Sequence, residues 1–177
     1  MSRCGAGLLG VMLFASGCTY YNAIYNAERS YDEAEAHRRA GRDSLASQSY
    51  RDVVRKAARG YRRDPEGEWG DDALFLLGRA RLRLGEIRAA RAALKEAAER
   101  SESADTRFAV LVYLALAEVE SGNSEAALPL IERALSGLTV GPALAEAHLL
   151  RGQVLLSQGA AGNGWADLDR AQELDAV

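Results

Sequence analysis

The side chains best suited to catalysis or metal binding are two histidines and two cysteines, and they do not form a set. His37 and His148 lie far apart in the chain, and Cys4 and Cys18 both lie near the N-terminus. A zinc site needs several such ligands at close spacing, and no cysteine pair accompanies either histidine. No glycine-rich phosphate loop follows a strand, and no nucleophile elbow is present. The sequence therefore predicts no enzyme, no metal and no cofactor.

The surroundings of each histidine favour a structural role. His37 stands in a charged run, so we expect it to be exposed. His148 precedes Leu149 and Leu150, which favours a position where two helices pack. The many Asp and Glu residues fall on helix faces, as salt-bridging surface residues do.

The first seventeen residues are typical of an export signal. Arg3 supplies the N-terminal positive charge, residues 8–14 are apolar apart from Gly10, and residues 15–17 are small. The apolar run is too short to span a bilayer, which needs roughly twenty residues. We therefore predict that residues 1–17 are a cleaved signal peptide.

Cys18 follows at the predicted cleavage point. Residues 15–18, Ala-Ser-Gly-Cys, resemble the lipobox of bacterial lipoproteins, with Ala15 where that family prefers Leu. The resemblance implies that Cys18 carries a diacylglyceryl thioether and an acylated amine. Several acyl chains anchor firmly, because each buried CH₂ contributes about 0.8 kcal/mol. By the family's sorting rule, Thr19 in place of Asp directs the protein to the outer membrane, facing the periplasm.

The alternative is an ordinary signal peptide with Cys18 left as a free thiol. Cys4 leaves with the signal in either case, so the mature chain holds one cysteine and no internal disulfide. A lone thiol is a liability in an oxidising periplasm, whereas a lipidated one is not. This argument favours the lipoprotein.

Glycines at a constant spacing reveal an internal repeat. Gly85, Gly122 and Gly159 stand 37 residues apart. Four more sets keep this register: Gly78, Ala115 and Gly152; Ala90, Ala127 and Gly164; Leu94, Ile131 and Leu168; Ala97, Ala134 and Ala171. The chain is rich in Ala, Leu, Arg and Glu, which favours helix. A repeat of this length predicts stacked helical units.

These units resemble the tetratricopeptide (TPR) repeat. The matching residues of the clearest unit are Leu74, Leu77, Gly78, Gly85, Ala90, Leu94 and Ala97. Leu74 replaces the usual Trp, Arg81 the usual Tyr, and Glu102 the usual Pro. The resemblance implies an all-α fold, a right-handed α-α superhelix of about four helical hairpins. The alternative is a plain bundle of α-hairpins without superhelical curvature.

The repeat divides the chain into a leader, a linker and one helical domain. We predict a signal peptide at 1–17, a lipid-anchored linker at 18–26 and a TPR-like domain at 27–177. The domain's units are expected at about 27–64, 71–102, 108–138 and 145–177.

The first helices of stacked TPR units line a concave groove, and the resemblance carries those positions onto this chain. They are Tyr31, Glu35 and Arg38 in the first unit; Phe75, Arg79, Leu82 and Arg83 in the second; Val112, Leu116 and Val119 in the third; and Leu149, Gln153 and Leu156 in the fourth. Such a groove suits a peptide or helix with apolar anchors, with an acidic residue for the arginines. The alternative for each residue is packing against a neighbouring helix.

A tyrosine-rich segment and a basic stretch are two further candidate surfaces. Tyr20, Tyr21, Ile24 and Tyr25 follow the lipid site at helical spacing, which suits either a membrane interface or a cap on the first helix pair. Residues 29–63 hold ten Lys or Arg against five Asp or Glu, whereas residues 101–177 hold four against eleven. The basic stretch is expected either to contact anionic headgroups or to form a solvated helix face.

The last helix lacks a polar capping helix after it. Terminal repeats usually need a polar outer face, so Leu168, Ala171 and Leu174 are expected to fray or to meet a partner, including a second copy of the chain.

Taken together, these features predict a lipid-anchored periplasmic scaffold that binds a protein or peptide, with no nucleic-acid or small-molecule ligand. The combination of lipobox, tyrosine-rich segment and TPR units is similar to the TPR lipoproteins related to BamD, which implies a role in outer-membrane protein assembly. The alternatives are a self-associating structural envelope protein and an accessory subunit of an export or secretion complex.

Overall fold

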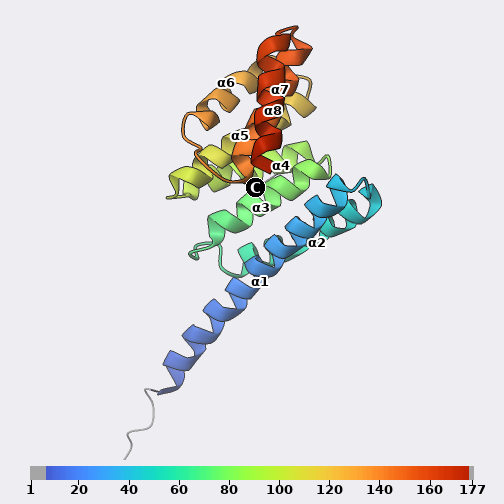
Figure 1. Ribbon diagram of the computed structural model, residues 1–177. Helices are drawn as coiled ribbons and strands as arrows, with labels where there is room; N and C mark the ends of the chain where they lie inside the picture. The colour runs from blue at the N-terminus through green and yellow to red at the C-terminus, as the bar shows by residue number, and fades with distance from the viewer. Residues whose placement is uncertain (1–6, 176–177) are drawn as a thin grey trace, which may run out of the picture. The chain divides into compact units, whose positions relative to one another are not determined.

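The computed structural model describes residues 7–175, and the side chains of residues 22–174. Within that range the chain forms eight helices and no strand (Figure 1). Their bounds are α1 Gly7–Arg39, α2 Asp43–Arg63, α3 Gly70–Arg83, α4 Ile87–Arg100, α5 Ala104–Glu120, α6 Ser124–Leu135, α7 Pro142–Ser157 and α8 Ala161–Asp175. The chain folds into two compact units, an N-terminal unit that ends at Leu84 and a C-terminal unit that begins at Gly85.

In the N-terminal unit, α1 and α2 form an antiparallel hairpin against which α3 packs (Figure 1). Helix α2 buries residues at alternating three- and four-residue spacing, which is one face of an α-helix. This face consists of Ala46, Tyr50, Val53, Ala57 and Gly60. It packs against α1, where Ala27, Tyr31 and Ala34 are at most 2% exposed. Small residues on both helices let the two backbones approach closely.

Helix α1 runs without interruption through residues 18–26, which the sequence analysis assigned to a linker. Ile24 is 2% exposed and Tyr25 is 46% exposed, so one side of this segment packs and the other faces solvent. Residues 1–6 of the predicted signal lie outside the described range, as does the side chain of Cys18. Within residues 7–175, no helix is both long enough and apolar enough to cross a bilayer.

The 37-residue glycine period corresponds to turns between helices. Gly85, Gly122 and Gly159 have φ values of +75°, +80° and +83°. A Cβ at these glycines would meet nothing within 4 Å, so the backbone conformation, and not space, requires glycine there. The amide of Gly122 donates to Val119 and that of Asn123 to Glu118, which is the Schellman pattern that ends a helix.

The same pattern recurs in the two outer hairpins. At the end of α1, Gly41 donates to Arg38 and Arg42 donates to His37. At the end of α7, Gly159 donates to Leu156 and Ala160 donates to Leu155. The helix ends at Gly41, Gly122 and Gly159 thus share one turn geometry, and Gly122 and Gly159 belong to the predicted 37-residue period.

In the C-terminal unit, α5 pairs with α6 and α7 with α8. At Gly152, one of the small residues that recur every 37 positions, the backbones of α7 and α8 approach closely. A Cβ added there would lie 2.9 Å from the Gly164 carbonyl oxygen on α8. Ala115 and Ala127, the equivalent positions of α5 and α6, are fully buried. The all-α fold of consecutive hairpins is confirmed.

Candidate functional site

A polar cluster in the N-terminal unit is centred on Glu35. Its Oε2 accepts hydrogen bonds from Nε and NH2 of Arg38, at 3.0 and 2.7 Å. Its Oε1 accepts from the Tyr50 hydroxyl at 2.5 Å and from Nε of Arg83 at 3.1 Å. One carboxylate of α1 therefore joins all three helices of this unit. The side chains of Glu35 and Arg83 are 13% and 14% exposed, so water screens the interaction little.

This environment fixes the charge of the cluster. Burial raises the pKa of Glu35, but the positive charges of Arg83 and Arg38 and the hydrogen bonds from Arg38 and Tyr50 outweigh burial and lower it to about 2. Burial and the neighbouring carboxylate raise the pKa of the Tyr50 phenol well above its ordinary value. At neutral pH the cluster holds an ionised Glu35 and a neutral Tyr50.

A stack of rings and a guanidinium lies beside this cluster. The Cζ atom of Arg79 lies 3.9 Å from the Tyr31 ring centroid and 5.3 Å from that of Phe75. The rings of Tyr31 and Tyr50 meet edge to face, with centroids 5.7 Å apart. Six of the predicted groove residues thus meet in one place: Tyr31, Glu35, Arg38, Phe75, Arg79 and Arg83. Each of the six has an ion pair or a ring contact with another of them.

This self-pairing changes how the arginines can serve a ligand. The sequence analysis expected Arg38, Arg79 and Arg83 to face an acidic residue of a bound peptide. In the structure Glu35 of the same chain pairs with Arg38 and Arg83, and aromatic rings cover Arg79. The attraction for a foreign carboxylate is therefore smaller than the sequence suggested.

The predicted groove residues of the C-terminal unit fall into a buried and an exposed group. Helices α5 and α7 contact each other, and equivalent positions on them are one repeat apart. Val112 is fully buried and Leu116 is 9% exposed, so both pack in the core. Leu149 is 36% exposed and Gln153 is also exposed, while Val119 is half-buried.

Two more predicted groove residues are engaged in packing. A Cβ added at Gly164 would lie 2.7 Å from Cγ of Leu156, which places that side chain against α8. Leu82, in the N-terminal unit, is 5% exposed. The exposed part of the predicted groove in the C-terminal unit therefore reduces to Val119, Leu149 and Gln153, and their binding role stays a prediction.

A second polar cluster links α7 to α8. Asp167 accepts hydrogen bonds at 2.6 Å from both Nε and NH2 of Arg151, and its Oδ1 lies 2.8 Å from Nδ1 of His148. Burial raises the pKa of Asp167, but the hydrogen bonds and charges of Arg151 and His148 outweigh it and lower that pKa. The geometry of this His–Asp–Arg cluster is that of a link between helices. His148 thus packs as expected.

His37 lies elsewhere and is half-buried, not exposed as expected. Its Nε2 is 3.7 Å from a carboxylate oxygen of Glu33, one turn earlier on α1. In the described part of the chain, no group of three His, Cys, Asp or Glu side chains is placed to hold a metal ion.

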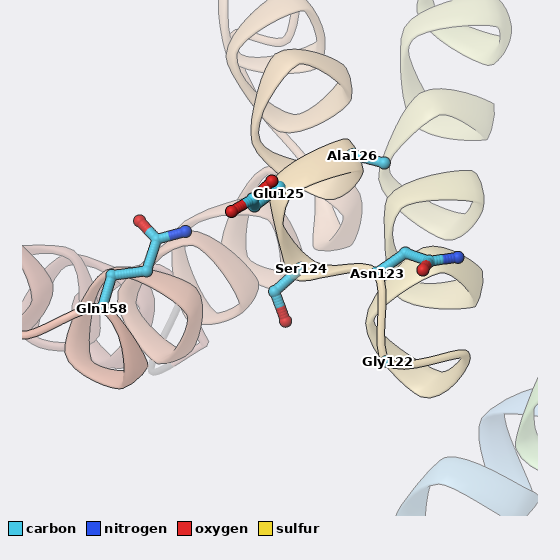
Figure 2. Close-up of a pocket in the computed structure, with 6 residues that line it drawn as sticks. All are labelled: Gly122, Asn123, Ser124, Glu125, Ala126 and Gln158. Atoms are coloured by element: carbon cyan, nitrogen blue, oxygen red, sulfur yellow. The ribbon is translucent and has the colours of Figure 1, made fainter.

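A surface pocket of about 630 Å³ lies where α6 begins and α7 ends (Figure 2). It is lined by Gly122, Asn123, Ser124, Glu125, Ala126 and Gln158. The Asn123 amide donates to Glu118 and does not cap α6. Glu125 is the one ionisable residue in the lining, so the pocket offers no pair of groups for proton transfer.

The terminal helix α8 is packed where the sequence analysis expected it to be uncovered. Ala171 is 6% exposed and Leu168 contacts the Gly152 position of α7. Leu174 is half-buried. The exposed apolar side chain of α8 is instead Trp165, at 58%.

Tyr50 and Asp167 are the site residues that sequence reasoning missed. Nothing local in the sequence pairs the Tyr50 hydroxyl with Glu35, which lies 15 residues earlier. No local sequence pattern predicts that Asp167 contacts Arg151 and His148 on α7.

Solved structures of MamA are among those to which this chain is similar. One, a crystal structure of MamA, is 17% identical, covers 99% of this chain and 97% of that chain, and has a TM-score of 0.49. MamA of AMB-1 is 16% identical over 86% of this chain and 93% of that chain, and MamA of MSR-1 is 19% identical over 85% and 97%; both have a TM-score of 0.47. No protein-family description matches the chain, and no curated protein does.

Proposed function

We propose that this protein is a membrane-anchored scaffold of the bacterial envelope that binds other proteins through its helical hairpins. The observation that carries the proposal is the repeated hairpin itself, with glycine turns at one constant period. Repeats of this kind present extended surfaces for protein binding. The two polar clusters hold helices together, so catalysis has no support in the described residues.

The proposed binding surface has a separate part in each unit. In the C-terminal unit it is the exposed face of α7 at Leu149 and Gln153, with Val119 of the contacting α5. In the N-terminal unit it is the Phe75–Arg79 stack on α3, next to Tyr31. The self-paired arginines favour a ligand anchored by apolar side chains over an acidic one.

The test is photocrosslinking in cells from a photoreactive amino acid at Leu149, with mass spectrometry of the adducts. Leu45 is a matched control, because it is an exposed leucine in the other unit, 45% accessible against 36%. The scaffold predicts a discrete partner from position 149 and none from position 45. Equal adduct patterns from the two positions would contradict a specific surface.

The anchor rests on the lipobox resemblance at Cys18. Labelling cells with a palmitate analogue should mark the wild-type chain and not Cys18→Ser. An unlabelled wild-type chain would refute the anchor while leaving the binding surface untouched. Fractionation should place the labelled chain in the outer membrane, as Thr19 implies; an inner-membrane chain would overturn that location.

The identity of the crosslinked partner distinguishes the pathways. Components of the β-barrel assembly machinery would support the BamD-type role, and export proteins would support an accessory subunit of a secretion complex. Adducts to a second copy of the chain would support a self-associating envelope protein. Trp165 gives this second candidate its structural support, since it exposes a large aromatic ring on the terminal helix.

A further inference from the structure

Helix α2 displays a row of arginines along its exposed side. Arg51, Arg55, Arg59 and Arg62 are all exposed, and we call them the arginine row. At about 100° per residue they fall within roughly a quarter of the helix circumference. They lie opposite the buried face of α2, so the hairpin with α1 leaves them free to meet another surface.

Few carboxylates contact the arginine row in the described part of the chain. Arg55 pairs with Asp52 at 2.8 Å, and this is the one carboxylate that any of the four contacts in the part of the chain the structure describes. The neighbouring carboxylates Asp64, Glu66 and Glu68 follow in the loop beyond the helix. The arginine row therefore differs from the cluster around Glu35, where Arg38 and Arg83 share the carboxylate of Glu35 inside the unit.

The antiparallel hairpin places one end of this row near the predicted lipid site. Tyr50 bonds Glu35, and further along the helix Nζ of Lys56 lies 2.7 Å from Oγ of Ser30 and 3.4 Å from the Asn26 carbonyl. Continuing this register puts Arg62 opposite about residue 22 of α1. That position is about one helical turn, or 6 Å along the axis, from Cys18.

Figure 1 shows the same arrangement, with the start of α1 projecting past the end of α2. Acyl chains on Cys18 would hold this end of the hairpin at the headgroups. Arg59 and Arg62 would then lie within or close to the distance, about 8 to 10 Å, over which charges are felt at physiological salt. Tyr25, 46% exposed on α1, has the amphipathic ring that suits such an interface.

We infer that the arginine row binds the phosphate headgroups of anionic lipids, so that the N-terminal hairpin lies against the membrane to which Cys18 tethers it. This rests on the anchor in the proposed function. Guanidinium groups suit this ligand because their fork of donors matches phosphate oxygens. A surface contact of this kind orients the scaffold, which a flexible tether alone does not.

The test compares two triple variants in the full chain carrying Cys18→Ser, which has no acyl group. One is Arg51→Gln/Arg59→Gln/Arg62→Gln. The control, Arg88→Gln/Lys95→Gln/Arg133→Gln, removes three exposed cations from the C-terminal unit and gives the same net charge. Partitioning is measured on phosphatidylcholine vesicles with and without phosphatidylglycerol, and the ratio between the two isolates the effect of lipid charge.

At about 1 kcal/mol for each arginine near an anionic surface, the row variant should lower this ratio by roughly 100-fold at low salt, and the control by far less. High salt should abolish the preference in the parent chain. Equal ratios in the two variants would overturn the inference. So would a row variant that keeps the lipid preference but changes the oligomeric state, since the row would then bind protein. Because the assay uses unacylated chain, its failure is distinct from a failure to label Cys18.

Discussion

Removing the negative charge of Glu35 should destabilise the N-terminal unit by an amount that depends on pH. The pKa of Glu35 is about 2 in the folded protein against an ordinary value of 4.5, a difference worth about 3 kcal/mol at neutral pH. Glu35→Gln keeps the shape of the side chain but leaves Arg38 and Arg83 without their anion. We therefore expect the variant to lose about 3 kcal/mol of unfolding free energy at pH 7.

The pH dependence carries the sign of a depressed carboxyl pKa. The stabilisation is fully present above pH 4.5 and is lost as the pH falls toward 2. At pH 3 the remaining contribution is about 1.4 kcal/mol, and near pH 2 it is under about 0.5 kcal/mol. The stability difference between wild type and Glu35→Gln should close over this interval.

Urea unfolding at several pH values measures this difference. Trp165 lies in the C-terminal unit, so a Trp165→Phe background leaves Trp69, which precedes α3, to report on the N-terminal unit. Glu99→Gln is the control, because Glu99 is exposed and its change should cost under about 0.5 kcal/mol. A Glu35→Gln effect that stays constant from pH 7 to 2, or that matches the control at pH 7, would refute the reasoning.

Three further predictions concern packing and charge. Gly152→Ala should lower the unfolding free energy by about 2 kcal/mol, because the new Cβ would lie 2.9 Å from the Gly164 carbonyl oxygen. The control Gly162→Ala, whose Cβ would have nothing within 4 Å, should be neutral or stabilising; thermal unfolding measures both. Asp167→Asn should lower the unfolding free energy of the C-terminal unit by roughly 2 to 4 kcal/mol at pH 7. The loss should be smaller in acid, because the pKa of Asp167 is lowered in the folded protein and its stabilisation fades as the pH falls below the ordinary value of 3.8. A pH-independent loss, measured by Trp165 fluorescence, would contradict this. Burial and the charges of Asp71 and Glu28 raise the pKa of Asp72 to about 6. After allowance for partial exposure and for the opposing helix dipole, Asp72→Asn should therefore stabilise the N-terminal unit by about 1 to 2 kcal/mol above pH 6. In urea titrations this gain should vanish near pH 4.

The helices and turns were predictable because their signals are local. Glycine is favoured where the backbone takes a φ near +80° at the end of a helix, so the 37-residue spacing marked the helix ends at Gly85, Gly122 and Gly159. The small residues at Gly152 and Ala127 likewise reported close approach of backbones. Helix α1 was harder, because the tyrosine-rich segment before residue 27 was compatible with either a linker or a helix.

The groove residues were less predictable because their exposure depends on partners distant in sequence. The family pattern marks Val112 and Leu149 as equivalent, yet the first is fully buried and the second 36% exposed. The pairing of Glu35 with Arg83 joins residues 48 apart, and no local rule selects that partner over solvent or a ligand. Sequence therefore located the repeat positions but not which of them remain available for binding.

The distribution of arginines now separates two roles that the sequence analysis had merged. Arg38 and Arg83 pair with Glu35 at the centre of the N-terminal unit, and this one carboxylate offsets part of their charge where a peptide is predicted to bind. The arginines of the outer face of α2 keep their charge, and the hairpin register carries that face toward the predicted anchor. With the proposed anchor at Cys18, the arginine row is expected to favour attachment to an anionic surface. Apolar contacts at Leu149 and Phe75 are then expected to supply the selectivity for protein partners.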